Sequence, residues 1–248
     1  MSNSVMKNLL YLIISSLFLL NPCFSSFAQE HSPDAKDVDW NELYKSVVNE
    51  YGFDQVLVNG IHYEDGYWGK VGHPFLFEDQ FYKGTLMFRG REYKGVDIKY
   101  DIYKQQVILY IMQNNSSAWI IPPNDFISAF SLGDKLFVKR TFQEVPRFYQ
   151  VVFDTEELKC LYYWSKSRFG SDHLRDYYSF RFTDSDRKTY LIVDDVLKKY
   201  SDNRSFVRLF PRECQVRIKQ YMKNNKIKVT KSSDVEIEKL VTYCRTLL

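Results

Sequence analysis

The chain has 248 residues, with 34 Lys and Arg against 31 Asp and Glu, so its formal net charge at pH 7 is only +3. This near balance argues against a dedicated nucleic-acid binder, which would need a marked excess of positive charge. The length is enough for one large domain with a sizeable core.

The first 28 residues have the pattern of a signal peptide. Lys7 provides the positive start, residues 9–20 form an apolar run, and Ser26-Phe27-Ala28 offers small residues for cleavage before Gln29. The run is shorter than the roughly 20 residues that span a bilayer. We therefore expect an exported protein in the periplasm or outside the cell, not membrane-spanning after signal removal.

The segment 59–74, NGIHYEDGYWGKVGHP, has the strongest functional pattern in the chain. Its glycines permit close backbone approach, and its aromatic rings offer flat faces to a sugar or a peptide. The candidate ligand-binding residues here are His62, Tyr67, Trp68 and His73, and the candidate metal ligands are His62, Glu64, Asp65 and His73. The alternative is a glycine-rich hairpin whose aromatic residues cap a sheet edge.

Turn residues then recur at nearly regular intervals, between segments rich in aromatic and β-branched residues. The predicted strands cover residues 82–88, 93–100, 106–112, 135–141, 148–153, 158–167, 177–183 and 189–193. We expect an antiparallel β-meander of about 8–10 strands, forming a curved sheet or a half-barrel. A short amphipathic helix is predicted over 39–51, before the sheet.

The C-terminal part, residues 194–248, is predicted to be helical and to complete a single secreted domain over 29–248. Pro211 is typical of a first helical turn, and Asn224-Asn225 would end this helix. Ser233 and Glu236 form a capping-box pattern at the start of a second one. The predicted fold class is therefore α+β, with a C-terminal pair of amphipathic helices.

Positive charge is concentrated at the C-terminus. Residues 198–248 hold 13 Lys and Arg against 5 acidic residues. A solvated helical face explains this excess, and attraction to an anionic surface is the functional alternative.

Three cysteines remain after signal removal, so at most one intramolecular bridge can form. Cys160 falls in a strand-like run and is expected to be a buried thiol. Cys214 and Cys244 fall on the apolar faces of the two helices. Antiparallel packing would bring them together, as a disulfide or as two buried thiols.

Aromatic residues make up 17% of the chain and suggest a second ligand site on the sheet. Tyr163 and Trp164 are its candidate ligand-binding residues, because such rings can line a groove for an apolar or glycan ligand. The alternative is that they belong to the core, since aromatic side chains dominate the packing of many sheets.

Two stretches carry a resemblance to a known group. These are GTLMFRGREYKGVDIKYD, residues 84–101, and FPRECQVRIKQYMKNNKIKVTKSSDVEIEKLVTYC, residues 210–244. Together they resemble secreted, uncharacterised proteins of Bacteroidetes-type bacteria, and the likeness covers most of the chain after residue 28. The resemblance implies a periplasmic or cell-surface setting and supplies no catalytic residue.

Common catalytic and cofactor motifs are missing from the sequence, which has no HExxH, GxSxG, CxxC, GxGxxG or GxxxxGK. We therefore expect no cofactor and no catalytic residue, and favour a non-enzymatic envelope protein. It would bind an envelope protein, a glycan or a lipid through its sheet. The alternative is a secreted hydrolase or metal-binding protein that uses loop 59–74, with Asp97 or Asp101 converging on it.

Overall fold

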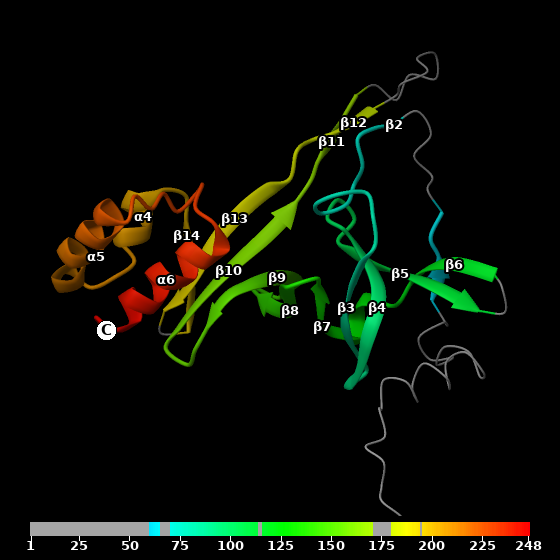
Figure 1. Cartoon of the computed structure of the whole chain (residues 1–248), viewed down its shortest axis with the longest axis horizontal. Helices are drawn as coiled ribbons and strands as arrows, with labels where there is room; N and C mark the ends of the chain where they lie inside the picture. Colours follow the sequence, from blue (N-terminus) through cyan, green and yellow to red (C-terminus); the bar gives the residue numbers. More distant parts are fainter. Residues whose placement is uncertain (1–59, 65–69, 114–115, 171–179, 194) are drawn as a thin grey trace, which may run out of the picture. The chain divides into compact units, whose positions relative to one another are not determined.

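The computed structural model describes residues 60–64, 70–113, 116–170, 180–193 and 195–248 (Figure 1). The chain divides into two compact units, residues 1–46 and 47–248, and every described residue belongs to the second. The predicted signal peptide over 1–28 and the predicted helix over 39–51 lie outside the described residues.

An open, antiparallel sheet of eleven strands forms most of the described unit. Its strands in chain order are β1 (Ile61–His62), β3 (Tyr82–Phe88), β4 (Arg91–Asp101), β5 (Gln106–Gln113), β6 (Ser116–Ile121), β7 (Ile127–Leu132), β8 (Lys135–Phe142), β9 (Val145–Asp154), β10 (Leu158–Ser165), β13 (Asp186–Val193) and β14 (Val196–Tyr200). The predicted α+β meander is confirmed. The sheet has edges at β1 and β14, so it does not close.

The strand order shows that the sheet consists of two meanders joined side by side. Its order is β1-β6-β5-β4-β3-β7-β8-β9-β10-β13-β14, so β7 pairs with β3 and not with β6. The connection from β6 to β7 contains the short 3-10 helix η1 (Asn124–Phe126). Arg89, in the β3–β4 turn, holds η1 because its backbone N–H donates to the Phe126 carbonyl at 2.9 Å.

A second, three-stranded sheet is made of β11 (Arg168–Phe169), β12 (Phe180–Phe182) and β2 (Lys70–Val71). Strand β12 pairs with β2 in parallel, which brings the end of loop 59–74 beside residues more than a hundred positions later. The described part of the strand predicted over 177–183 contains β12, outside the main meander, and residues 177–179 lie outside the described residues.

Helices α4 (Asn203–Val207), α5 (Arg212–Asn224) and α6 (Asp234–Arg245) complete the chain. The predicted pair of helices corresponds to α5 and α6, and the Ser233–Glu236 capping box is present at the start of α6. The predicted helical part 194–248 needs a correction, because strand β14 occupies its first residues. Sequence periodicity did not separate this five-residue strand from the helices that follow.

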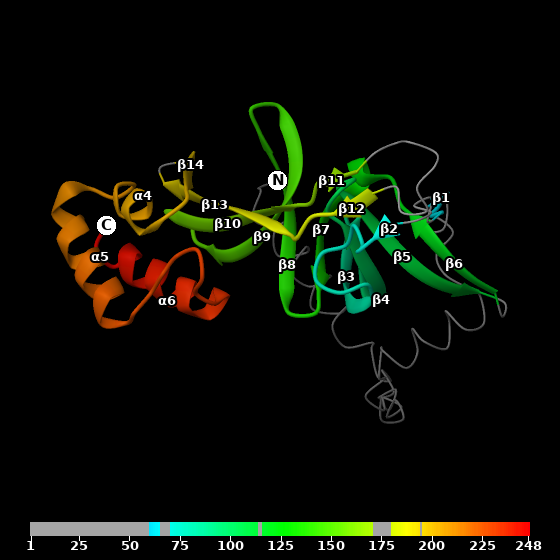
Figure 2. The same ribbon diagram turned by 90° about the horizontal axis from the view of Figure 1, so that it is seen from above.

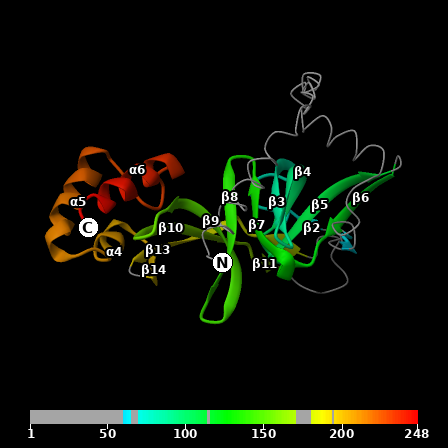
Figure 3. The same cartoon turned by 90° about the horizontal axis from the view of Figure 1, so that it is seen from below.

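Most buried apolar side chains belong to two large clusters, and two smaller clusters accompany them. The first lies among β3 to β9 and contains Tyr100, Phe130 and Phe137. The second lies between β10, β13, β14 and the three helices, and includes Tyr162 and Leu240. Figures 2 and 3 show the helices gathered beside these strands. Trp164 packs against both clusters, so its side chain joins them.

A polar network fixes the start of α6 to the sheet. The buried Gln150 side chain donates from Nε2 to Asp234 Oδ2 at 2.7 Å and accepts at Oε1 from Trp164 Nε1 at 2.7 Å. Lys135 adds an ion pair with Asp234 at 2.9 Å. Because buried polar groups are costly when unpaired, this network favours one position of the helix on the sheet.

Candidate functional site

The described part of loop 59–74 positions its two histidines differently. His62 lies exposed on β1, opposite Ile120 of β6, and Glu64 is also exposed. His73 is half-buried, and its ring stacks on Phe75 with 5.9 Å between centroids. Asp65, Tyr67 and Trp68 lie outside the described residues, so their candidate roles stay predictions.

The surroundings of His73 favour a neutral imidazole. Burial is the main cause that lowers its pKa, and the positive charge of Lys166 adds to it. Lys166 Nζ donates to the carbonyl oxygens of His73 and Phe75 at 2.8 and 2.9 Å. The His73 Nδ1 atom is buried and has no hydrogen-bond partner among the described residues.

The two aspartates considered for a hydrolase have other partners. Asp97 forms an ion pair with Lys83 at 2.7 Å. Asp101 is buried at the end of β4, where its Oδ1 accepts from the N–H groups of Tyr103 and Lys104. Among the described residues, no group of three or more His, Cys, Asp and Glu side chains could hold a metal ion. With residues 65–69 outside the description, the metal site stays a prediction.

Strand alternation separates the two candidate residues of β10. Trp164 shares a face with Tyr162, packs against the two buried clusters and donates to Gln150. Tyr163 points to the opposite face, which no described helix covers, and belongs to a separate cluster with Tyr149 and Leu161. Trp164 and Tyr163 are both half-buried, Trp164 against the two clusters and Tyr163 on the opposite face, and the ligand-binding role of each stays a prediction.

We call the side chains of Phe142, Arg147, Tyr149, Tyr163 and Tyr190 the tyrosine face. Tyr149 is its centre, with ring centroids 5.4 Å from Phe142, 5.9 Å from Tyr163 and 5.9 Å from Tyr190. The Arg147 guanidinium carbon lies 5.1 Å from the Tyr163 ring centroid, within cation–π range. Three phenols and one guanidinium thus converge from β9, β10 and β13.

A cavity of about 520 Å³ adjoins this face, between the β8–β9 hairpin and the β13–β14 turn. Phe142, Val145, Val196 and Leu197 give it an apolar wall, while Arg147 and Lys199 add positive charge. Asp195 is the only carboxylate among the described residues that line it. The volume lies within the roughly 300–1,000 Å³ of small-molecule sites.

The phenols of the tyrosine face remain protonated at neutral pH. Burial is the main cause that raises the pKa of Tyr149, Tyr163 and Tyr190, and Arg147 opposes it. Each hydroxyl can therefore both donate and accept a hydrogen bond. The arrangement combines flat apolar rings with directional polar groups.

The three cysteines among the described residues, Cys160, Cys214 and Cys244, are free, buried thiols. Cys214 Sγ donates to the Leu247 carbonyl at 3.0 Å, and Cys160 Sγ lies 3.4 Å from the Tyr200 hydroxyl. Burial raises the pKa of both Cys160 and Cys244 to about 12. The disulfide between Cys214 and Cys244 is not formed in this structure and stays a prediction.

Comparisons with known proteins gave no match: no family model, curated protein or solved structure matches this chain. The resemblance to secreted Bacteroidetes-type proteins therefore stays a prediction. Among the described residues, no helix combines the length and apolar character needed to cross a membrane.

Sequence reasoning found Tyr163 but missed Arg147, Tyr149 and Tyr190. These residues lie on three strands and meet only through the pairing of β9 with β10 and of β10 with β13. One signal in the sequence could have found two of them. Side chains alternate between the two faces of a strand, so Arg147 and Tyr149, two positions apart, share a face of β9.

Proposed function

We propose that this protein is a non-enzymatic binding protein that acts after export and holds a glycan on the tyrosine face. The observation that carries the proposal is the convergence of Tyr149, Tyr163, Tyr190 and Arg147 beside a cavity of about 520 Å³. A sugar ring has an apolar face that fits an aromatic ring, and its hydroxyls suit phenol and guanidinium groups.

The same site favours binding over hydrolysis. Glycoside hydrolysis commonly needs two carboxyl groups, one on each side of the scissile bond. The cavity beside the tyrosine face has Asp195 as its only carboxylate among the described residues. Rigid aromatic side chains also lose little conformational entropy on binding, which suits a recognition surface.

A glycan array probed with the labelled chain from Gln29 tests the proposal, followed by titration of the strongest hit. Tyr163→Ala and Arg147→Gln should each raise the dissociation constant at least tenfold, because each removes a side chain of the tyrosine face. Tyr243→Ala is the matched control. Tyr243 is also half-buried, but it stacks on Tyr221 between α5 and α6.

Failure of the folded protein to bind any glycan would contradict the proposal. Equal binding by the Tyr163 variant, the Arg147 variant and the control would also contradict it. In that second case a glycan binds elsewhere on the chain.

A further inference from the structure

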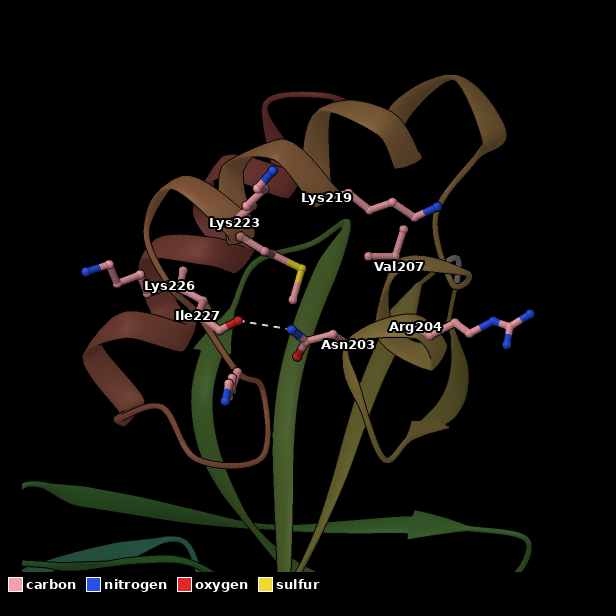
Figure 4. Close-up of a pocket in the computed structure, with 9 residues that line it drawn as sticks. Asn203, Arg204, Val207, Lys219, Lys223, Lys226 and Ile227 are labelled. Carbon is pink, nitrogen blue, oxygen red and sulfur yellow. Dashed lines mark hydrogen bonds between the residues drawn. The ribbon is translucent and has the colours of Figure 1, made fainter.

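A second cavity, of about 540 Å³, lies between α4, α5 and the chain that follows α5 (Figure 4). Its floor is apolar and consists of Val207, Met222 and Ile227, all of which are buried. Asn203 braces the floor, because its Nδ2 donates to the Ile227 carbonyl at 3.0 Å and its Oδ1 accepts from the Val229 N–H at 2.9 Å. The floor is thus held by polar bonds to its surroundings.

The rim of this cavity carries five positive charges. They belong to Arg204, Lys219, Lys223, Lys226 and Lys228, and every one of these side chains is exposed. No acidic residue is among the described residues that line the cavity, and none of the five forms an ion pair with another described residue. Figure 4 shows the labelled Lys and Arg side chains pointing outward, with Lys226 and Arg204 on opposite sides of the view.

Stabilisation of helix α5 explains only some of the positive charges on the rim. Lys223 lies in the last turn of α5 and Lys226 lies just after the helix ends, where positive charge interacts favourably with the helix dipole. Lys219 lies inside the helix, one turn before Lys223, and like charges at this spacing destabilise a helix. The whole segment 203–228 holds eight Lys and Arg against one Glu, a net charge of +7. Nothing in the described part of the unit neutralises this rim.

We propose that this cavity binds a dissolved single-chain amphiphile with a phosphate group. Its apolar chain would lie on the floor of Val207, Met222 and Ile227, with the phosphate among the basic side chains of the rim. Phosphate is preferred because its multiple negative charge matches several cations, and charge-assisted hydrogen bonds from Lys and Arg are the strong ones. The helices pack on the sheet face opposite Tyr163, so this site is independent of the tyrosine face.

The test is isothermal titration of the chain from Gln29 with dodecyl phosphate below its micelle concentration. We expect one molecule bound per chain. Lys219→Gln combined with Lys223→Gln should raise the dissociation constant at least tenfold. Arg212→Gln combined with Arg217→Gln is the matched control, because it removes two exposed charges from the same helix outside the cavity. The control should change the dissociation constant less than threefold.

Three further probes decide the chemistry of the ligand. Inorganic phosphate and dodecyl maltoside should each bind at least tenfold more weakly than dodecyl phosphate, because each lacks one half of the amphiphile. Equal binding of either one would overturn the proposal, as would equal weakening by the two double variants. Binding to anionic phospholipid vesicles without binding of dissolved dodecyl phosphate would also overturn it and would identify a membrane-surface contact instead.

Discussion

Asp101 shows how one buried side chain links local structure to stability. Its Oδ1 accepts two backbone N–H groups and so fixes the turn between β4 and β5, whereas its Oδ2 is buried without a hydrogen-bond partner among the described residues. Burial is the main cause that raises the pKa of this carboxyl. The turn thus gains an acceptor at the cost of a poorly solvated charge.

Asp101 should give the stability a specific pH dependence. Its folded pKa lies above the ordinary value of 3.8, so the folded state holds this proton where the unfolded chain has lost it. The contribution of Asp101 to stability therefore falls as pH rises from about 3.8 to the raised folded pKa. The Asp101→Asn variant keeps the Oδ1 acceptor but cannot titrate. The free energy of unfolding of this variant, compared with that of the unmodified chain, should therefore increase as pH rises over this window.

Urea unfolding at a series of pH values measures this difference. Asp125→Asn, which removes an exposed carboxylate, controls for the change in net charge. A stability difference between the Asp101 variant and the unmodified chain that stays constant with pH would contradict the argument.

The junction of the two meanders, between β3 and β7, depends on a close backbone approach. A Cβ atom at Gly84 would collide with the carbonyl oxygen of Ser131. At the same point the register of β3 against β4 shifts, and Ser131 Oγ accepts from the Thr85 N–H at 2.9 Å. A glycine is therefore required here for steric reasons.

Gly84→Ala should lower the free energy of unfolding by about 1–3 kcal/mol, the usual cost of forcing extra volume into a packed site. Gly90→Ala is an informative comparison, because Gly90 has open space around its Cβ position and a φ of +76°. The Gly90→Ala variant measures the cost of the left-handed conformation alone, about 1 kcal/mol. Urea denaturation measures the loss of unfolding free energy in each variant. A smaller loss for Gly84→Ala than for Gly90→Ala would contradict the steric account.

The strands and helices differ in how well they could be predicted from the sequence. The strands with alternating aromatic and β-branched residues and the capped helix α6 were predicted, because their signals lie within a few neighbouring residues. Strands β6, β7 and β14 were missed. The pairing of β7 with β3 was also missed, because it depends on contacts about 40 residues apart that leave no local pattern.

The described unit contains two large clusters that Trp164 connects, beside two smaller ones. All three described thiols lie in the second cluster, and burial holds the pKa of Cys160 and Cys244 at about 12. Since the thiolate is the reactive form, these side chains should not react while the helices cover the sheet. In the chain from Gln29, which lacks Cys23, thiol reactivity thus reports on the second cluster.

We expect the two clusters to unfold together. In urea, with the cysteines reduced, the midpoint from thiol labelling should coincide with the midpoint from near-ultraviolet circular dichroism, since coincident probes indicate a single transition. Trp164→Ala should lower stability by about 3–5 kcal/mol and separate the two midpoints. Thiol labelling at a lower urea concentration in the unmodified chain would show that the helices open independently.

Hydrophobic periodicity and capping residues act over short distances, so the α+β class, the strand-rich centre, the helix pair and the position of Tyr163 in a strand could be predicted from the residues alone. The partners of each side chain across the sheet could be assigned only from the strand pairing and helix packing. Strand pairing brought Arg147, Tyr149 and Tyr190 to Tyr163, and packed Trp164 against the two large buried clusters. Helix packing likewise formed the basic cavity. Both sites depend on register and packing, which arise from contacts between residues far apart in the chain.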